Sequence, residues 1–117
     1  MIGDERFTHP KAQPPTIMAR VKHIALIKFN DGTSPEQIDQ VFNHLLDLSE
    51  TIPGVEDFVG GPNNSPEGLH KGYTHGFIMT FADAAARDAY LPHPDHATFQ
   101  AAAGPLFADV AVFDFEL

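Results

Sequence analysis

The chain has 117 residues, a formal net charge of −9 and no cysteine. This length allows one compact domain and is too short for two. The lack of cysteine excludes disulfides, thiol nucleophiles and cysteine-bound zinc or iron–sulfur centres. Only seven Lys and Arg residues are present, and they are scattered, which argues against binding to nucleic acid or to an anionic membrane surface.

The first 20 residues differ in composition from the rest of the chain. They contain His9-Pro10 and Pro14-Pro15 and few apolar side chains, a composition typical of a flexible arm. The folded domain is therefore expected over residues 21–117. The arm lacks the apolar centre of a secretory signal, and no apolar run is long enough to span a bilayer. Together with the absence of cysteine, these features predict a cytoplasmic protein.

The domain is predicted to begin with a strand and a long helix. Residues 21–29 are apolar on both alternating faces, which indicates a strand covered on both sides. A helix follows over residues 34–52, with its buried residues at helical spacing. Its start carries a capping box, in which Ser34 and Gln37 flank Pro35 at the first helical position.

The middle of the chain predicts two further strands. After Pro53-Gly54 ends the helix, a short strand is expected at residues 55–60, and a polar loop at residues 61–72. The next strand is expected at residues 73–81. One of its faces consists of aromatic, methionine and histidine side chains: Tyr73, His75, Phe77, Met79 and Phe81.

The last third predicts two short helices and a final strand. Asp83 can cap a helix that runs to about Tyr90, where two prolines break it. A third short helix is expected at residues 96–103 and ends at a Gly-Pro pair. Residues 110–117 form the predicted last strand.

The resulting order, β-α-β-β-α-β, is that of a ferredoxin-like α+β fold. Right-handed crossovers are expected to place the first and third strands side by side and parallel. The helices would then cover one face of the sheet. The other face would present the Phe and Met side chains, which are too apolar to remain exposed in a monomer. A second copy of the chain is the expected cover, so the sequence predicts a homodimer.

The segment from Tyr90 to His96 concentrates proton-transfer chemistry. It holds one phenol, one carboxylate and two imidazoles within seven residues at a predicted helix–turn–helix junction. Histidine titrates near neutral pH, so a positioned imidazole can take or give a proton. His23 and His75 share the face of the strand Phe and Met residues, where they either line the polar end of a pocket or are core histidines with satisfied hydrogen bonds.

Several blocks of the sequence resemble the stress-responsive A/B barrel domain (Dabb) family. The resemblance covers about residues 21–117. It rests on the blocks Val21-Lys22-His23-Ile24, Ser65-Pro66-Glu67-Gly68, Lys71-Gly72-Tyr73-Thr74-His75 and Ala89-Tyr90-Leu91-Pro92-His93-Pro94-Asp95-His96. It implies a dimeric α+β barrel, in which two ferredoxin-like units close their sheets against each other.

The resemblance also implies roles for individual residues. A plant member of the family is a polyketide cyclase that performs an aldol condensation with a catalytic histidine and tyrosine. These fall on His96 and Tyr90 here, and two further pocket histidines fall on His23 and His75. An aldol step needs a base, for which a neutral imidazole is suited, and a donor to the developing oxyanion, for which a phenol is suited. A position near a helix N-terminus favours neutral His96, whose ring Asp95 or a backbone carbonyl can orient.

The leading interpretation is a homodimer that binds a small carbonyl compound and transforms it by cofactor-free proton transfer. No cofactor or metal is expected, because His93, Asp95 and His96 lack the spacing of a helical ligand pair. His93 is expected to cap the helix that begins at Pro94. Two alternatives stay open: a non-catalytic stress-response or ligand-binding protein, and a cofactor-independent or haem-binding monooxygenase-like barrel, from which the family blocks point away.

Overall fold

The computed structural model describes residues 19–117, so the predicted N-terminal arm lies almost wholly outside the described residues. The observed elements are β1 (Val21–Phe29), α2 (Pro35–Thr51), β2 (Val55–Pro62), β3 (His75–Phe81), α3 (Ala84–Tyr90), α4 (Pro94–Ala103), the 3₁₀ helix η1 (Gly104–Leu106) and β4 (Phe107–Glu116). This order confirms the predicted ferredoxin-like α+β fold with one additional short helix.

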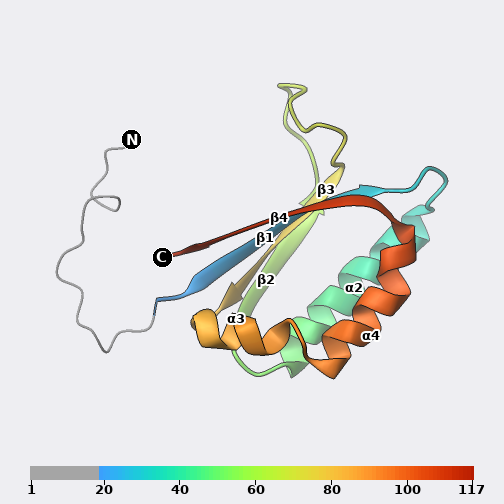
Figure 1. Cartoon of the computed structure of the whole chain (residues 1–117). Helices are drawn as coiled ribbons and strands as arrows, with labels where there is room; N and C mark the ends of the chain where they lie inside the picture. The colour runs from blue at the N-terminus through green and yellow to red at the C-terminus, as the bar shows by residue number, and fades with distance from the viewer. Residues whose placement is uncertain (1–18) are drawn as a thin grey trace.

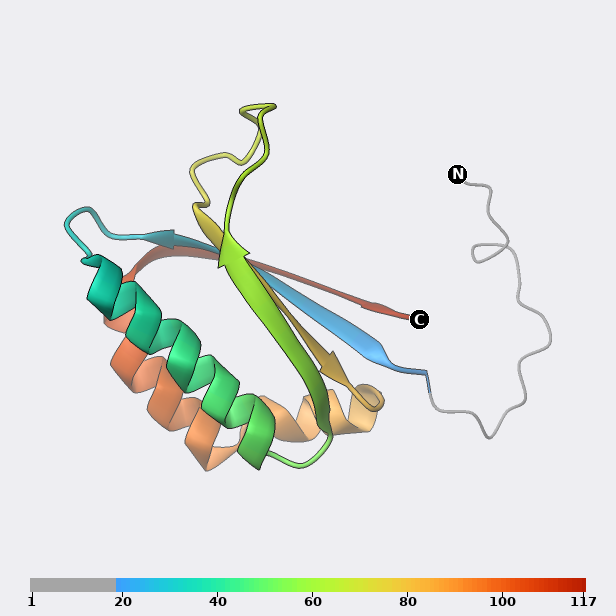
Figure 2. The same cartoon turned by 180° about the vertical axis from the view of Figure 1, so that it is seen from behind.

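The four strands form one sheet in the order β2-β3-β1-β4, and every neighbouring pair is antiparallel. The prediction that β1 and β3 are neighbours is confirmed, whereas their predicted parallel direction is wrong. The connection through α2 makes β2 parallel to β1. The hairpin after β2 then reverses the chain direction and places β3 between β2 and β1, so β3 is antiparallel to both. All helices lie on one face of the sheet, as both views show (Figure 1, Figure 2).

Several element bounds differ from the prediction because tertiary pairing extends the strands. β2 continues through Gly60 and Gly61 to Pro62, since their backbones pair with β3. The loop consequently shifts from residues 61–72 to residues 63–74, and β3 begins at His75 rather than at residue 73. A hydrogen bond of 2.8 Å from the Asn63 N–H to the Thr74 carbonyl closes this loop. β4 likewise begins at Phe107 rather than at residue 110, because it pairs with the end of β1.

The predicted helix caps are observed. The Ser34 hydroxyl accepts from the Gln37 N–H, and the Gln37 side chain accepts from the Ser34 N–H, which completes the capping box. Asp83 caps α3. α4 begins at Pro94, as the predicted His93 cap requires and two residues before the predicted range of 96–103. His93 accepts a hydrogen bond of 3.0 Å from the Asp95 N–H.

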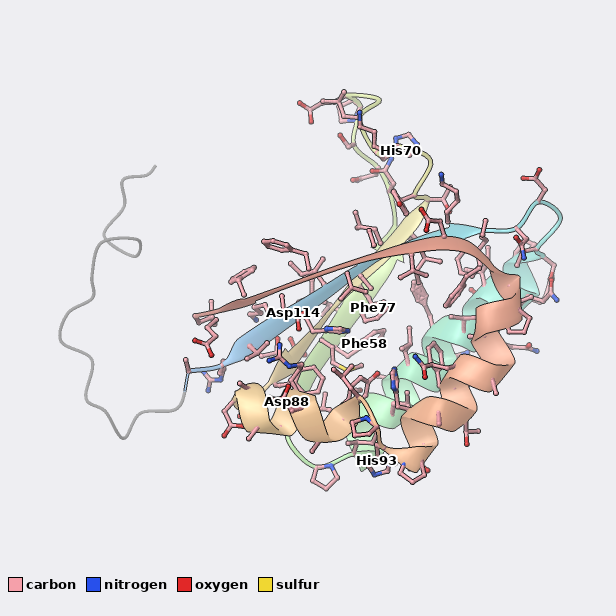
Figure 3. All side chains as sticks on the ribbon, in the orientation of Figure 1. Phe58, His70, Phe77, Asp88, His93 and Asp114 are labelled. Atoms are coloured by element: carbon pink, nitrogen blue, oxygen red, sulfur yellow. The ribbon has the colours of Figure 1, made fainter. Side chains whose placement is uncertain are left out.

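The core lies between the sheet and the helices. It includes the odd-numbered residues of β1 and β3 and one stripe of α2: Val21, Ala25, Ile27, Phe77, Met79, Phe81, Val41, Leu45 and Leu48. Figure 3 shows Phe77 and Phe58 in this layer. The prediction that the Phe and Met side chains of the third strand face away from the helices is therefore wrong. Period-two alternation separates two faces, but it does not say which one the helices cover.

The face away from the helices is also apolar. Its exposed side chains come from all four strands: Leu26, Val59, Ile78, Phe113 and Phe115. The sequence predicted an uncovered apolar face, and this face is present. It is formed by the residues listed above and not by the predicted Phe and Met side chains of the third strand. Exposed apolar patches of this kind mark interaction surfaces in soluble proteins.

The turn between α2 and β2 generates a stability prediction. Gly54 has φ +91°, and a Cβ there would lie 2.6 Å from the Ala86 Cβ of α3. Gly32 has φ +85° with no atom within 4 Å of its Cβ position. We expect Gly32→Ala to cost about 1 to 2 kcal/mol from backbone strain alone. Gly54→Ala should cost ~1 to 3 kcal/mol more, because α3 must shift.

Urea unfolding of the two variants measures this difference. Equal losses of unfolding free energy in the two variants would show that α3 accommodates the added Cβ at residue 54 without a packing cost.

Candidate functional site

The structure brings together the two predicted catalytic side chains. Tyr90 is the last residue of α3, and His96 is the third residue of α4. Their ring centroids are 4.4 Å apart, and both side chains are buried against the helix-facing side of the sheet. The tight connection between the helices causes this proximity. It is fixed by hydrogen bonds from the Leu91 N–H to the Arg87 carbonyl and from the His93 N–H to the Tyr90 carbonyl.

The environment of His96 fixes its tautomer. Its Nδ1 atom lies 2.9 Å from the Leu91 carbonyl oxygen. A carbonyl can only accept, so Nδ1 carries the proton and donates, which leaves the lone pair of the neutral ring on Nε2. The ring is therefore oriented by a backbone carbonyl, one of the two predicted options. Asp95, the other option, lies beside His93 instead. Within residues 19–117, Nε2 of His96 has no hydrogen-bond partner.

Tyr90 is a buried hydrogen-bond donor. Only 1% of its surface is exposed, and burial raises its pKa from 10.0 to about 12. The hydroxyl consequently stays protonated at neutral pH. Among the described residues it has no hydrogen-bond partner, although a buried hydroxyl without one costs about 1 to 3 kcal/mol. A buried polar atom left in this state calls for a ligand or a water to satisfy it.

His23 completes the cluster from the side of the sheet. Its ring centroid is 6.4 Å from that of Tyr90, and its Nδ1 lies 2.8 Å from Oδ1 of Asp114. The other carboxylate oxygen of Asp114 accepts from Nη1 of Arg87, also at 2.8 Å. The carboxylate therefore holds the proton of His23 on Nδ1, and the lone pair of the neutral ring again lies on Nε2.

Neither Asp114 nor Arg87 stands out in the sequence as a member of this site. Asp114 lies between two phenylalanines of the last strand, and it meets His23 only because the two residues are opposite each other in the β1–β4 register. Figure 3 shows Asp114 on β4, on the side of the sheet that faces α3. The one available signal was a carboxylate within an apolar strand, since a buried charge requires a partner.

His75 is not part of this cluster. It pairs with Ile27 on β1, whereas His23 lies four residues away, roughly 13 Å along the strand. The ring packs against Phe29 and Phe42, and partial burial lowers the pKa of His75 below its ordinary value. The two strand histidines thus share a face, as predicted, but the structure places them at opposite ends of it.

Two pockets formed by residues 19–117 do not include Tyr90 or His96. The larger, of about 440 Å³, lies beneath the loop of residues 63–74 and includes His75. The smaller, of about 160 Å³, lies between α2 and α4. The cluster is instead approached from the β4 side. Val110 and Val112, on the helix-facing side of that strand, remain exposed, so the helices leave this edge open.

Residues 19–117 also bear on the expectations for metal binding, membrane spanning and helix capping. Residues 19–117 contain no group of three His, Asp or Glu side chains placed to hold a metal ion. None of the helices in that range is both long and apolar enough to cross a bilayer. His93 is used as a helix cap at the α3–α4 turn, as predicted (Figure 3).

The raised pKa of Tyr90 predicts a specific loss of stability in alkali. Between pH 10 and 12 the unfolded chain loses the phenol proton that the folded chain keeps, so ionisation favours unfolding as pH rises. We expect the free energy of unfolding to fall by about 2 to 3 kcal/mol more in the wild-type protein than in Tyr90→Phe over this range. Urea titrations at pH 9 and pH 12 measure it. Tyr73→Phe measures the separate contribution of the other tyrosine, because its hydrogen bond to Asp109 also raises the pKa of Tyr73.

Comparison with known proteins identifies relatives by sequence. The chain is 40% identical over 79 residues to the stress-response A/B barrel domain-containing protein HS1 of Arabidopsis thaliana, covering 68% of this chain and 72% of the relative. It is 27% identical over 95 residues to olivetolic acid cyclase of Cannabis sativa, covering 81% and 94% of the two chains.

Solved structures show the same fold. The crystal structure of At3g17210 from Arabidopsis thaliana has a TM-score of 0.80 and 36% identity, covering 83% of this chain and 94% of that one. A dimeric ferredoxin-like protein of unknown function from Thermobifida fusca has a TM-score of 0.73 and 28% identity, covering 86% and 92%. The family model of the stress-responsive A/B barrel domain matches residues 21–117. The chain therefore belongs to the stress-responsive A/B barrel domain (Dabb) family.

Proposed function

We propose that this protein binds a small carbonyl compound beside Tyr90, His96 and His23 and transfers a proton on it without a cofactor. One observation carries the proposal. The rings of His96 and His23 lie 4.4 Å and 6.4 Å from the ring of Tyr90, and the Tyr90 hydroxyl and both Nε2 atoms have no hydrogen-bond partner among residues 19–117. Such atoms are satisfied in a native protein, so a polar ligand or ordered water is required.

The donor and acceptor pattern of these atoms selects the chemistry of the ligand. Tyr90 donates, which fits a carbonyl oxygen, while the two imidazole nitrogens accept. In the proposed step, Nε2 of His96 takes a proton from the carbon next to the carbonyl. The C–H electron pair forms the enolate double bond, and the oxygen gains the carbonyl pair. Tyr90 then donates to that oxygen, which becomes the stronger acceptor as charge develops.

His23 is proposed to hold a second oxygen of the same compound. Its free Nε2 accepts from a hydroxyl or an enol, and its position is fixed by Asp114. A relative with 27% identity is olivetolic acid cyclase, which supports small-molecule chemistry on this scaffold. His75 is at the far end of the strand, so we propose for it at most a contact with the remote part of a longer ligand.

We also propose that the active form is a homodimer. The related Thermobifida fusca protein is described as dimeric, and the sheet face away from the helices exposes apolar side chains from every strand. A second copy covers this face while leaving the helix-side cluster in each subunit intact.

Ligand binding without turnover is the second candidate. The close packing of the Tyr90 and His96 rings favours it, since a site used only for binding needs no room for a moving substrate. Proton transfer separates the two candidates, because binding alone leaves the C–H bonds of the ligand intact.

The test is deuterium exchange at the α-carbon of small ketones in D₂O, followed by NMR, with binding measured by thermal shift. We expect the wild-type protein to accelerate exchange and His96→Ala to lose it by about 10² to 10⁴-fold, the usual contribution of a general base. Tyr90→Phe should retain binding but lose ~10²-fold or more of the rate, because the oxyanion donor is gone.

His93→Ala is the matched control. It removes a histidine three residues away that acts as a cap, so it should cost about 1 kcal/mol of stability and leave exchange unchanged. Exchange by His96→Ala at the wild-type rate would remove the general-base role. Stabilisation by a ketone without any exchange would leave the binding protein as the function.

A further inference from the structure

The sheet face away from the helices contains a hollow. Gly61 of β2 and Gly76 of β3 are directly opposite each other in the register and lie on this face. Neither has a side chain, so the floor between them is bare backbone beside Leu26 of β1. The loop of residues 63–74 rises over this corner (Figure 1) and closes the roof of the 440 Å³ pocket.

The same face carries two protruding aromatic side chains at its opposite corner. Phe113 and Phe115 lie on β4, opposite Ile24 and Lys22 of β1, near the start of that strand. Phe113 is 67% exposed and Phe115 is 40% exposed. Large aromatic side chains with this exposure are the usual anchors of protein interfaces, because each buries much area for little lost side-chain freedom.

We propose that the pocket beneath the loop of residues 63–74 receives Phe113 and Phe115 of a second copy of this chain. The inference rests on the homodimer proposed above and names the contact that forms it. The lining surface of the hollow is mostly apolar, and Leu26, Leu69 and Tyr73 contribute to it, which matches an aromatic ring.

Two-fold symmetry makes this arrangement self-consistent. In an isologous dimer, if the corner with the hollow meets the corner with the aromatic pair, the reverse contact forms as well. A two-fold axis between the sheets that exchanges opposite corners fills both hollows and covers both aromatic pairs. The assembly is closed, so no hollow or aromatic pair remains to bind a third copy.

The loop over the hollow is anchored before any partner arrives. The Tyr73 hydroxyl donates a hydrogen bond of 2.6 Å to Asp109, and Nζ of Lys28 lies 5.1 Å from the centre of the Tyr73 ring. These contacts tie the base of the loop to β4 and β1. A pre-formed pocket loses less conformational entropy on binding than a flexible loop does.

Filling the hollow tests the proposal without disturbing the subunit. A Cβ at Gly61 would meet no atom within 4 Å, and the residue does not have positive φ, so Gly61→Leu should fold normally. Its side chain would occupy the site of the partner ring. Gly104→Leu is the matched control, since Gly104 also has open space around its Cβ but lies after α4, away from this face.

We expect sedimentation equilibrium to show dimers for the wild-type protein and for Gly104→Leu, and a dissociation constant at least about 100-fold higher for Gly61→Leu. A wild-type monomer would overturn both the homodimer and this contact. A wild-type dimer that Gly61→Leu leaves unchanged would overturn the contact alone and leave the pocket to a small ligand.

Cysteine pairing gives a second readout that does not depend on Gly61→Leu. The chain has no cysteine, so introduced thiols report without background. A mixture of Leu69→Cys and Phe113→Cys proteins should form a disulfide-linked heterodimer on mild oxidation, whereas each alone should not. Self-linkage of Phe113→Cys alone would place that residue on the two-fold axis and contradict the proposed contact.

Discussion

One constraint organises this molecule: a four-stranded sheet that is apolar on both faces has helices on only one of them. Burial of apolar surface is the main driving force of folding, so the covered face becomes the core and the uncovered face remains available for association. The two proposed activities of the chain follow from this division. The polar cluster lies on the helix side, and the proposed interface lies on the other.

The polar cluster is confined by the same packing that builds the core. Tyr90 and His96 come from consecutive helices, and His23 comes from the strand beneath them. Burial keeps the phenol protonated, and the Leu91 carbonyl and the Asp114 carboxylate fix the proton of each imidazole. With both imidazoles neutral, the site therefore presents one donor and two acceptors in fixed orientations. Such preorganisation favours the stabilisation of a developing oxyanion.

On the uncovered face, glycines form a depression and large side chains form a projection. The facing pair Gly61 and Gly76 leaves a hollow, while Phe113 and Phe115 project elsewhere on the same face. A face with both features is complementary to itself under two-fold symmetry. Each subunit has its own core and a loop anchored through Tyr73 and Asp109, so association of two copies does not have to order either of them.

Much of the fold was predictable from local signals. The caps at Ser34, Asp83 and His93 depend on residues within one helical turn of one another, and the structure confirms each of them. The closeness of Tyr90 and His96 was predictable for the same reason, because only five residues separate them and two of these are prolines, which leaves the chain few ways to turn.

What the sequence by itself determined is thus the set of elements, their order, the family and the pair of catalytic candidates. Only the tertiary structure decided the direction of β3 and which sheet face the helices cover. It also decided that Asp114 contacts the polar cluster through His23, whereas His75 lies outside that cluster. These features depend on strand register. Register joins residues far apart in the chain, and it is selected by the packing of the whole sheet rather than by any local pattern.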